Sequence, residues 1–227
     1  MSKRTAELEK LIDKTKSYLV DEAVDLVKQT AKAKFDESVE VHIKLGIDTK
    51  KSDQLIRSTV VLPHGTGKTR KVAVIAKGEK VTEAESAGAD VVGSEDLMDK
   101  ISKGWMDFDV LVSTPDLMKE LSKLGKVLGP KGLMPNPKSG TCTFDLAKAI
   151  KELKGGRVEF KNDDNGIIHA SVGKASFEKA KLAENIKLFI ETVQKAKPSA
   201  VKGVYMESIS VSASMGPGIK LTLAQKF

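Results

Sequence analysis

The chain has 227 residues, with 38 basic and 31 acidic side chains and a formal net charge of +7. This length is enough for a sizeable core and two domains, and the positive balance favours an acidic partner such as nucleic acid. The single cysteine, Cys142, excludes an intramolecular disulfide and a cysteine-rich metal site. The sequence contains no apolar run long enough to cross a membrane, so no membrane span is expected. The N-terminal residues lack an apolar signal core, so we expect an intracellular protein.

Two short helices are expected first, over residues 5–16 and 21–33, with Asp21 as the N-cap of the second. Apolar and polar side chains then alternate strictly over residues 39–45. This pattern predicts a half-buried antiparallel strand with one polar face. The polar side chains of that face are Glu40, His42 and Lys44.

From about residue 67, apolar segments alternate with helical patterns. Strands are expected at 72–76, 89–93 and 108–112, and helices at 80–87, 95–103, 115–124 and about 145–154. Strands that alternate with helices predict an α/β domain, here with a Rossmann-like, largely parallel, three-layer arrangement.

Residues 125–141 are dense in glycine and proline and contain no acid. This composition predicts neither a helix nor a central strand but a stiff loop. Its lysines are Lys126, Lys131 and Lys138. A rigid cationic loop suits a polyanion such as phosphate, and the alternative is a surface loop whose lysines only keep it solvated.

After Gly155-Gly156 the sequence returns to the pattern of alternating apolar and polar residues that is typical of antiparallel strands. Strands are expected at 157–161 and 167–172, joined by a turn at 162–166, and at 203–214 and 218–223. Between these pairs, Ser176 is expected to cap a helix that runs to about Lys197. In the strand expected at 203–214, one face carries serines 208, 210, 212 and 214. This face is either simply solvated or a surface that RNA approaches closely.

The first and last thirds of the chain therefore share a pattern of antiparallel strands with helices, whereas in the middle third buried strands alternate with helices. We expect a discontinuous α+β domain at 1–66 and 157–227, with an antiparallel sheet and helices, and an inserted α/β domain at 67–156. Glycines at the two crossings would let the domains hinge. The overall fold class is α/β.

One segment suggests an alternative function. Residues 65–69 imitate the end of a phosphate-binding P-loop, but the first glycine of that motif would stand at Leu62, and a strand rather than a helix is expected to follow. A nucleotide-dependent enzyme built on the insert is therefore the alternative hypothesis. The histidines, His42, His64 and His169, have no metal-binding spacing, and we expect no catalytic residue, metal ion or cofactor.

Phe35 stands among polar residues at an element boundary. Such a side chain either stacks on a base or ribose, or anchors the adjoining element. Aromatic residues make up only 4% of the chain, so base stacking would depend on very few side chains.

Several segments together resemble one family, bacterial large-subunit ribosomal protein L-one, the protein of the mobile rRNA stalk. The resemblance rests, in chain order, on residues 35–42 with 45–48, 104–109, 129–138, 172–177 and 214–217. The glycine- and proline-rich segment 129–138 is the most specific of these. The match covers nearly the whole chain.

The resemblance implies that the discontinuous domain carries the main RNA contacts. At matching positions these are Lys34, Phe35, Ser38, Glu40, Ser208, Ser214, Met215 and Gly216. The family often has threonine where this chain has Ser214, and the hydroxyl is kept. Accessory RNA contacts are expected from His42, Lys44, His169, Lys126, Lys131 and Lys138.

The resemblance also implies a function. A protein of this family is a cytoplasmic, ribosome-bound, non-enzymatic monomer that binds the stalk region of large-subunit rRNA. It acts as deacylated tRNA leaves the exit site, and bacterial members can repress their own operon by binding an mRNA site that imitates the rRNA site. A free repressor whose main target is mRNA is a further hypothesis.

Overall fold

The computed structural model describes residues 7–222 and divides the chain into two compact units. Unit 1 combines the chain up to Gly67 with the chain from Val158 onward, and unit 2 is Lys68–Arg157. Among the described residues, no helix has the length and the apolar character that a bilayer crossing requires.

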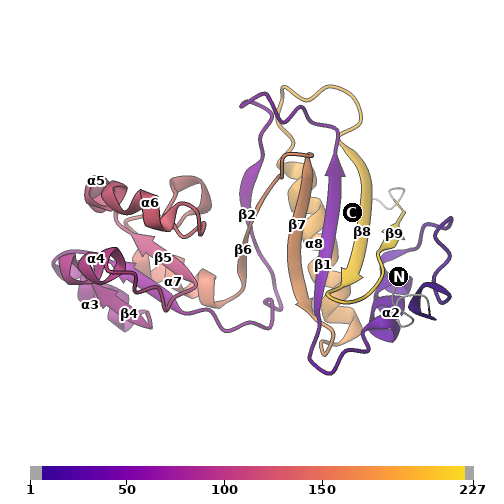
Figure 1. The fold of residues 1–227 in the computed structure, drawn as a ribbon, viewed down its shortest axis with the longest axis horizontal. Coiled ribbons are helices and arrows are strands. Elements are labelled where there is room, and N and C mark those ends of the chain that lie inside the picture. Colours follow the sequence, from indigo (N-terminus) through magenta and orange to yellow (C-terminus); the bar gives the residue numbers. More distant parts are fainter. Residues whose placement is uncertain (1–6, 223–227) are drawn as a thin grey trace. The chain divides into compact units, whose positions relative to one another are not determined.

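Unit 1 is built on a four-stranded antiparallel sheet in the order β7-β1-β8-β9 (Figure 1). Its strands are β1 (Ser38–Leu45), β7 (Ile167–Lys174), β8 (Met206–Ala213) and β9 (Ile219–Leu221). The predicted alternation in β1 is confirmed, because its apolar residues are buried and its polar residues are half-buried. The central position of β1 brings segments from both ends of the chain into one sheet.

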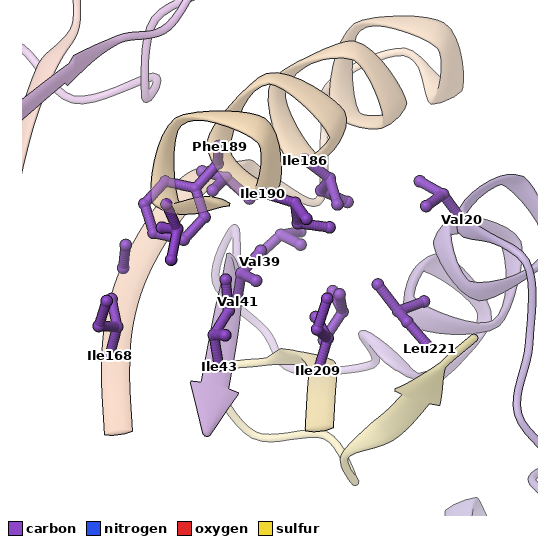
Figure 2. Close-up of a cluster of buried hydrophobic side chains, with 14 of the residues drawn as sticks. Val20, Val39, Val41, Ile43, Ile168, Ile186, Phe189, Ile190, Ile209 and Leu221 are labelled. Atoms are coloured by element: carbon purple, nitrogen blue, oxygen red, sulfur yellow. The ribbon is translucent and has the colours of Figure 1, made fainter. Parts of the chain in front are cut away.

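Two helices pack on this sheet, α2 (Val20–Thr30) against β8 and β9 and α8 (Lys179–Lys195) against β7. Figure 2 shows Val41 and Ile43 of β1 facing Phe189 of α8, and all three side chains are fully buried. Burying a side chain of this size stabilises the fold by about 1.5–3 kcal/mol. The apolar face of the sheet is thus covered by helices.

A second, two-stranded sheet pairs β2 (Arg57–Val61) with β6 (Arg157–Lys161). No strand was expected at β2 from the sequence. The predicted turn is present, since the Asp163 carboxylate accepts hydrogen bonds from the backbone N–H groups of Asn165 and Ile167. The strands that it joins, β6 and β7, belong to different sheets.

Unit 2 has a three-stranded parallel sheet in the order β4-β3-β5. Its strands are β3 (Val72–Ile75), β4 (Val91–Gly93) and β5 (Val110–Ser113). Helices α3 (Glu79–Ser86) and α7 (Leu146–Lys154) contribute to one buried cluster with this sheet, and α4 (Glu95–Ser102), α5 (Met118–Leu121) and α6 (Gly125–Leu128) contribute to another. The predicted three-layer α/β arrangement is confirmed.

Both predicted helix caps are wrong. Helix α2 begins at Val20 with Leu19 as its N-cap, and the Glu22 carboxylate accepts a hydrogen bond from the Leu19 N–H at 3.4 Å. The N-cap of α8 is Glu178, not Ser176. The N–H and the hydroxyl of Ser176 instead donate to the Asp36 carboxylate at 3.1 and 2.8 Å, a tertiary contact that a local pattern cannot predict.

The expected helix at 5–16 lies partly outside the described residues. Of the described part, residues 7–9 are helical and the rest consists of turns and irregular structure. The Asp13 carboxylate accepts hydrogen bonds from the N–H and the hydroxyl of Thr15, and such local bonds compete with helix. Strand β8 starts at Met206, not residue 203, because Gly203 has a left-handed φ of 88°. Strand β9 ends at Leu221, and residue 223 of its predicted range is not described.

The predicted helix at 115–124 is broken into 3₁₀ turns, Pro115–Leu117 and Ser122–Leu124, around the short helix α5. The segment at 125–141 is also less irregular than predicted, since it contains α6 and a 3₁₀ turn at Pro137–Ser139. Leu128 is fully buried in the unit 2 core, and this burial offsets the cost of glycine in the helical turn.

Candidate nucleic-acid interface

The polar face of the unit 1 sheet carries several of the residues expected to contact RNA. Glu40, His42 and Lys44 of β1 are half-buried, whereas the intervening valine and isoleucine side chains are buried against the helices. Serines 208, 210 and 212 of β8 lie opposite them in the antiparallel register. The sheet therefore presents hydroxyl, imidazole, ammonium and carboxylate groups together on one face.

At one end of this sheet, two loops bring together Lys34, Phe35, Ser38, Ser214 and Met215, which we call the sheet-end cluster. The Ser214 hydroxyl accepts a hydrogen bond from the Ser38 N–H at 3.0 Å and lies 3.2 Å from the Ser38 carbonyl oxygen, to which it donates. The Ser214 N–H also donates to that carbonyl, at 3.0 Å. Segments 176 residues apart are joined in this way.

The apolar members of the cluster are open to solvent. Phe35 and Met215 are each 57% exposed, although large apolar side chains are normally buried. Lys34 is also exposed. An ammonium group and two apolar side chains are thus presented to solvent from adjoining loops, a combination that suits phosphates together with base or ribose faces.

Glu37 joins this cluster, although it is not among the residues selected from the sequence. Its side chain is 1% exposed, and its two carboxylate oxygens accept hydrogen bonds from the N–H groups of Ala33 and Met215 at 2.8 and 2.9 Å. The only signal in the sequence is an acid placed between two expected RNA contacts, Phe35 and Ser38.

Lys174, at the end of β7, supports the same loop. Its ammonium group donates to the carbonyl oxygen of Asp36 at 3.1 Å and to the Ser38 hydroxyl at 3.0 Å. The register between β1 and β7 shifts here, between Val39 and Glu40, and such bulges bend a strand and re-aim its side chains. The loop that carries Phe35 is therefore held from β7 as well as from β8.

Glu40 lies on the polar face between Ser171 of β7 and Ser212 of β8, its register partners. The Ser171 hydroxyl is buried and has no hydrogen-bond partner within the described protein. A carboxylate with hydroxyls on either side can accept from a base amine or a 2′-hydroxyl.

His42 and His169 are register partners with their Nδ1 atoms 2.8 Å apart, and the His42 Nε2 lies 3.2 Å from the Ser212 hydroxyl. Burial lowers the pKa of His42 from its ordinary value of 6.5, His169 lowers it further, and Glu40 acts in the opposite direction. His169 also approaches the Asp163 carboxylate, at 3.6 Å. His42 and His169 were both expected as accessory RNA contacts, and the structure brings them into contact.

Ser208 is not part of the sheet-end cluster. It pairs with Lys44, whereas Ser214 follows the far end of β8, about 20 Å away at the usual rise per strand residue. The Lys44 ammonium group donates to the carbonyl oxygen of Asn165. A ligand would have to extend along the whole polar face to reach both serines.

Gly216 follows Met215, and its N–H donates to the Ala213 carbonyl oxygen at 2.9 Å. A Cβ atom added there would lie 3.3 Å from the Ala213 Cβ and 3.4 Å from the hydroxyl oxygen of Thr30. Thr30 is fully buried. The absence of a side chain thus lets this turn pack closely on α2, in addition to any approach by RNA.

The unit 2 loop presents its lysines as predicted. Lys126, Lys131 and Lys138 are exposed. Asn136 closes the loop, because its side chain accepts from the Lys138 N–H at 2.8 Å and its N–H donates to the Thr141 hydroxyl at 2.9 Å. The cations therefore project from a segment whose backbone is internally braced.

A comparison with protein-family models finds a match to the ribosomal protein L1p/L10e family over residues 27–217. The chain belongs to this family. The predicted resemblance is thereby confirmed, and the match includes the sheet-end cluster, the polar face and the lysine loop. Members of the family are structural, rRNA-binding components of the large ribosomal subunit, which places this chain with the cytoplasmic ribosome.

The local fold at residues 65–69 does not support the alternative hypothesis of a nucleotide-binding enzyme. Gly65 and Gly67 have left-handed φ values of 64° and 71°, and β3 rather than a helix follows them. A P-loop needs a helix whose N-terminal amides meet the phosphate. Among residues 7–222, no group of three or more histidine, cysteine or acidic side chains is arranged to hold a metal ion.

Proposed function

We propose that this L1p/L10e family member binds the stalk region of large-subunit rRNA through the sheet-end cluster and the adjoining polar face of unit 1. The observation that supports this most is the exposure of Phe35 and Met215, each 57%, on loops held by hydrogen bonds to buried groups. Exposed apolar side chains on anchored loops are expected at a surface that another molecule covers.

Each residue of the proposed interface has a physical role. Lys34 neutralises a phosphate, and Phe35 and Met215 pack on base or ribose faces. Ser208 and Glu40 supply hydrogen bonds to base edges and to 2′-hydroxyls, and the 2′-hydroxyl is the group that distinguishes RNA from DNA. The hydroxyl of Ser214 is already engaged with Ser38, so its main role is to shape the loop.

Unit 2 has a different part in this proposal. Its exposed lysines, Lys126, Lys131 and Lys138, contact the backbone of rRNA or of deacylated tRNA at the exit site as the stalk moves. Because these cations are braced by the loop but surrounded by solvent, their contribution is electrostatic, independent of sequence and sensitive to salt.

The same unit 1 surface is proposed to bind an mRNA site on the protein's own operon when free protein accumulates. An RNA that presents the same backbone shape to the cluster would satisfy the same contacts, and a repressor function needs no second site. Competition between rRNA and mRNA fragments for one protein molecule is the consequence that can be measured.

The test is a titration of the purified protein with a stalk rRNA fragment at several salt concentrations, together with Phe35→Ala. Loss of one stacked aromatic group should weaken binding by about 1–3 kcal/mol at every salt concentration. Leu55→Ala is the matched control, because Leu55 is 49% exposed in unit 1 and lies outside the cluster. An rRNA affinity equally insensitive to both changes would place the contact elsewhere.

The form of the salt dependence separates the alternatives. Specific binding that persists at moderate salt supports the unit 1 surface. Weak binding that falls steeply with salt and is equal for any RNA would mean that only sequence-independent electrostatic attraction is present. Tighter binding to the mRNA fragment than to the rRNA fragment would favour a free repressor over a ribosomal role.

A further inference from the structure

Glu37 is an acidic side chain inside a surface proposed to bind a polyanion. A carboxylate near phosphates opposes binding through its charge, so its presence needs another explanation. Because Glu37 is 1% exposed, it cannot itself offer an accessible group to RNA. Its influence must act through the residues that it contacts.

Those contacts join three separate segments. One carboxylate oxygen accepts from the Ala33 N–H, immediately before Lys34 and Phe35, and the other accepts from the Met215 N–H in the loop after β8. The Glu37 backbone carbonyl oxygen accepts from the Ala175 N–H at 2.8 Å, after β7. Both loops that present the exposed apolar side chains are therefore tied to a single buried group.

We propose that Glu37 is a positioning residue that fixes the Phe35 loop and the Met215 loop in one mutual arrangement before RNA arrives. This inference rests on the proposed function of the sheet-end cluster. Loops that are already ordered lose less conformational entropy on binding, so the preorganised protein binds its specific RNA more tightly. The benefit applies to an RNA that fits the arrangement and not to contacts made by charge alone.

The chemistry of the two partners requires a carboxylate of this length. Both partners are N–H donors at 2.8 and 2.9 Å, and hydrogen bonds from N–H to a carboxylate are among the strong ones. A glutamine would turn an amide NH₂ toward one of the two donors and lose that bond. An aspartate would keep the charge but, one methylene shorter, would not reach both donors.

The experiment compares Glu37→Gln and Glu37→Asp with the unmodified protein, each titrated with the stalk rRNA fragment and with an unrelated RNA of equal length. We expect the affinity of both variants for the stalk fragment to fall by about tenfold or more, because each variant loses at least one charge-assisted hydrogen bond. Binding to the unrelated RNA should change less than twofold. Asp53→Asn, an exposed acid of unit 1 outside the cluster, controls for the removal of one negative charge.

The sign of the effect separates positioning from charge. If Glu37 acted only as a negative charge, Glu37→Gln would strengthen binding to both RNAs and Glu37→Asp would leave both unchanged. Either result in a folded variant would overturn the proposal. An equal weakening toward both RNAs would also overturn it, because general damage to the domain does not discriminate between RNA sequences.

Amide hydrogen exchange in the unmodified protein gives a test that does not depend on a variant folding. The N–H groups of Ala33 and Met215 should exchange more slowly than those of Lys34 and Phe35, because they donate to a buried carboxylate. Rapid exchange at both would refute the proposal. If Phe35→Ala leaves rRNA affinity unchanged while these amides are protected, the proposed RNA-binding surface is refuted, but the hydrogen bonds from both loops to Glu37 are supported.

Discussion

The contact between His42 and His169 predicts how stability depends on pH. In the fold the pKa of His42 is lowered from 6.5 by burial and by His169, whereas in the unfolded chain it keeps its ordinary value. Below about pH 6.5 the unfolded chain therefore binds a proton that the folded chain excludes. The free energy of unfolding is preserved above this pH and falls as the pH decreases toward and through the folded pKa.

The magnitude follows from one proton. Differential uptake of a single proton changes the free energy of unfolding by at most about 1.4 kcal/mol per pH unit. The nearby charged groups are Glu40, which opposes the shift, and Asp163 beside His169. Hydrogen bonds hold the pKa values of Asp90 and Asp163 below the ordinary value of 3.8. The titration of these carboxylates therefore changes stability in a more acidic range than that of His42.

Chemical unfolding measured at half-unit steps between about pH 7.5 and pH 5 tests this expectation. The unmodified protein should lose stability below about pH 6.5, and His42→Gln should show a flatter profile in the same range. His64→Gln is the control, since His64 lies outside this pair and contacts Glu184. Identical slopes for the unmodified protein and His42→Gln would refute the reasoning.

Three further predictions concern the core, the cluster and the lysine loop. Ser214→Ala removes the hydroxyl that bonds to Ser38, so it should cost about 1 kcal/mol in unfolding free energy and weaken rRNA binding, as measured by denaturation and titration. Phe189→Ala should cost about 3–5 kcal/mol because the ring is fully buried, and unchanged stability on urea unfolding would contradict the described core. Replacing Lys126, Lys131 and Lys138 by alanine should lower the slope of log affinity against log salt by about 0.7–0.9 for each phosphate that the loop no longer neutralises, with an unchanged slope showing that the loop does not meet RNA.

Sequence periodicity predicted most of the elements that fill the core. The alternation in β1 and the continuous apolar strands of unit 2 reflect burial on one face or on both, and burial of this kind is written locally in the chain. The order β7-β1-β8-β9 was not predicted, because pairing partners are set by contacts between residues far apart in the sequence. Strand β2 was missed because it has no alternating pattern of burial: of its five residues only Val60 is buried.

Pattern and composition indicated the polar face and the lysine loop, but the sheet-end cluster could be selected from the sequence only through family resemblance. Composition and spacing left Phe35 as either a stacking side chain or a packing anchor, and its exposure of 57% removes the second interpretation. Glu37 had no local signature, because its role depends on Met215, 178 residues away. Side chains that shape a site through distant partners are the least accessible to sequence reasoning.

The interface proposed above would bind RNA in two modes on one chain. The sheet-end cluster combines one exposed lysine, Lys34, with exposed apolar side chains and hydroxyls, and the carboxylate of Glu37 is buried beside them. It should therefore hold RNA mainly by shape and contact. The unit 2 loop displays lysines without acids. Raising the salt concentration should therefore weaken the second mode first. A member of the family that binds its stalk RNA at salt concentrations where nonspecific RNA dissociates would be using the cluster, and in that regime Phe35→Ala should matter and changes to the loop lysines should not.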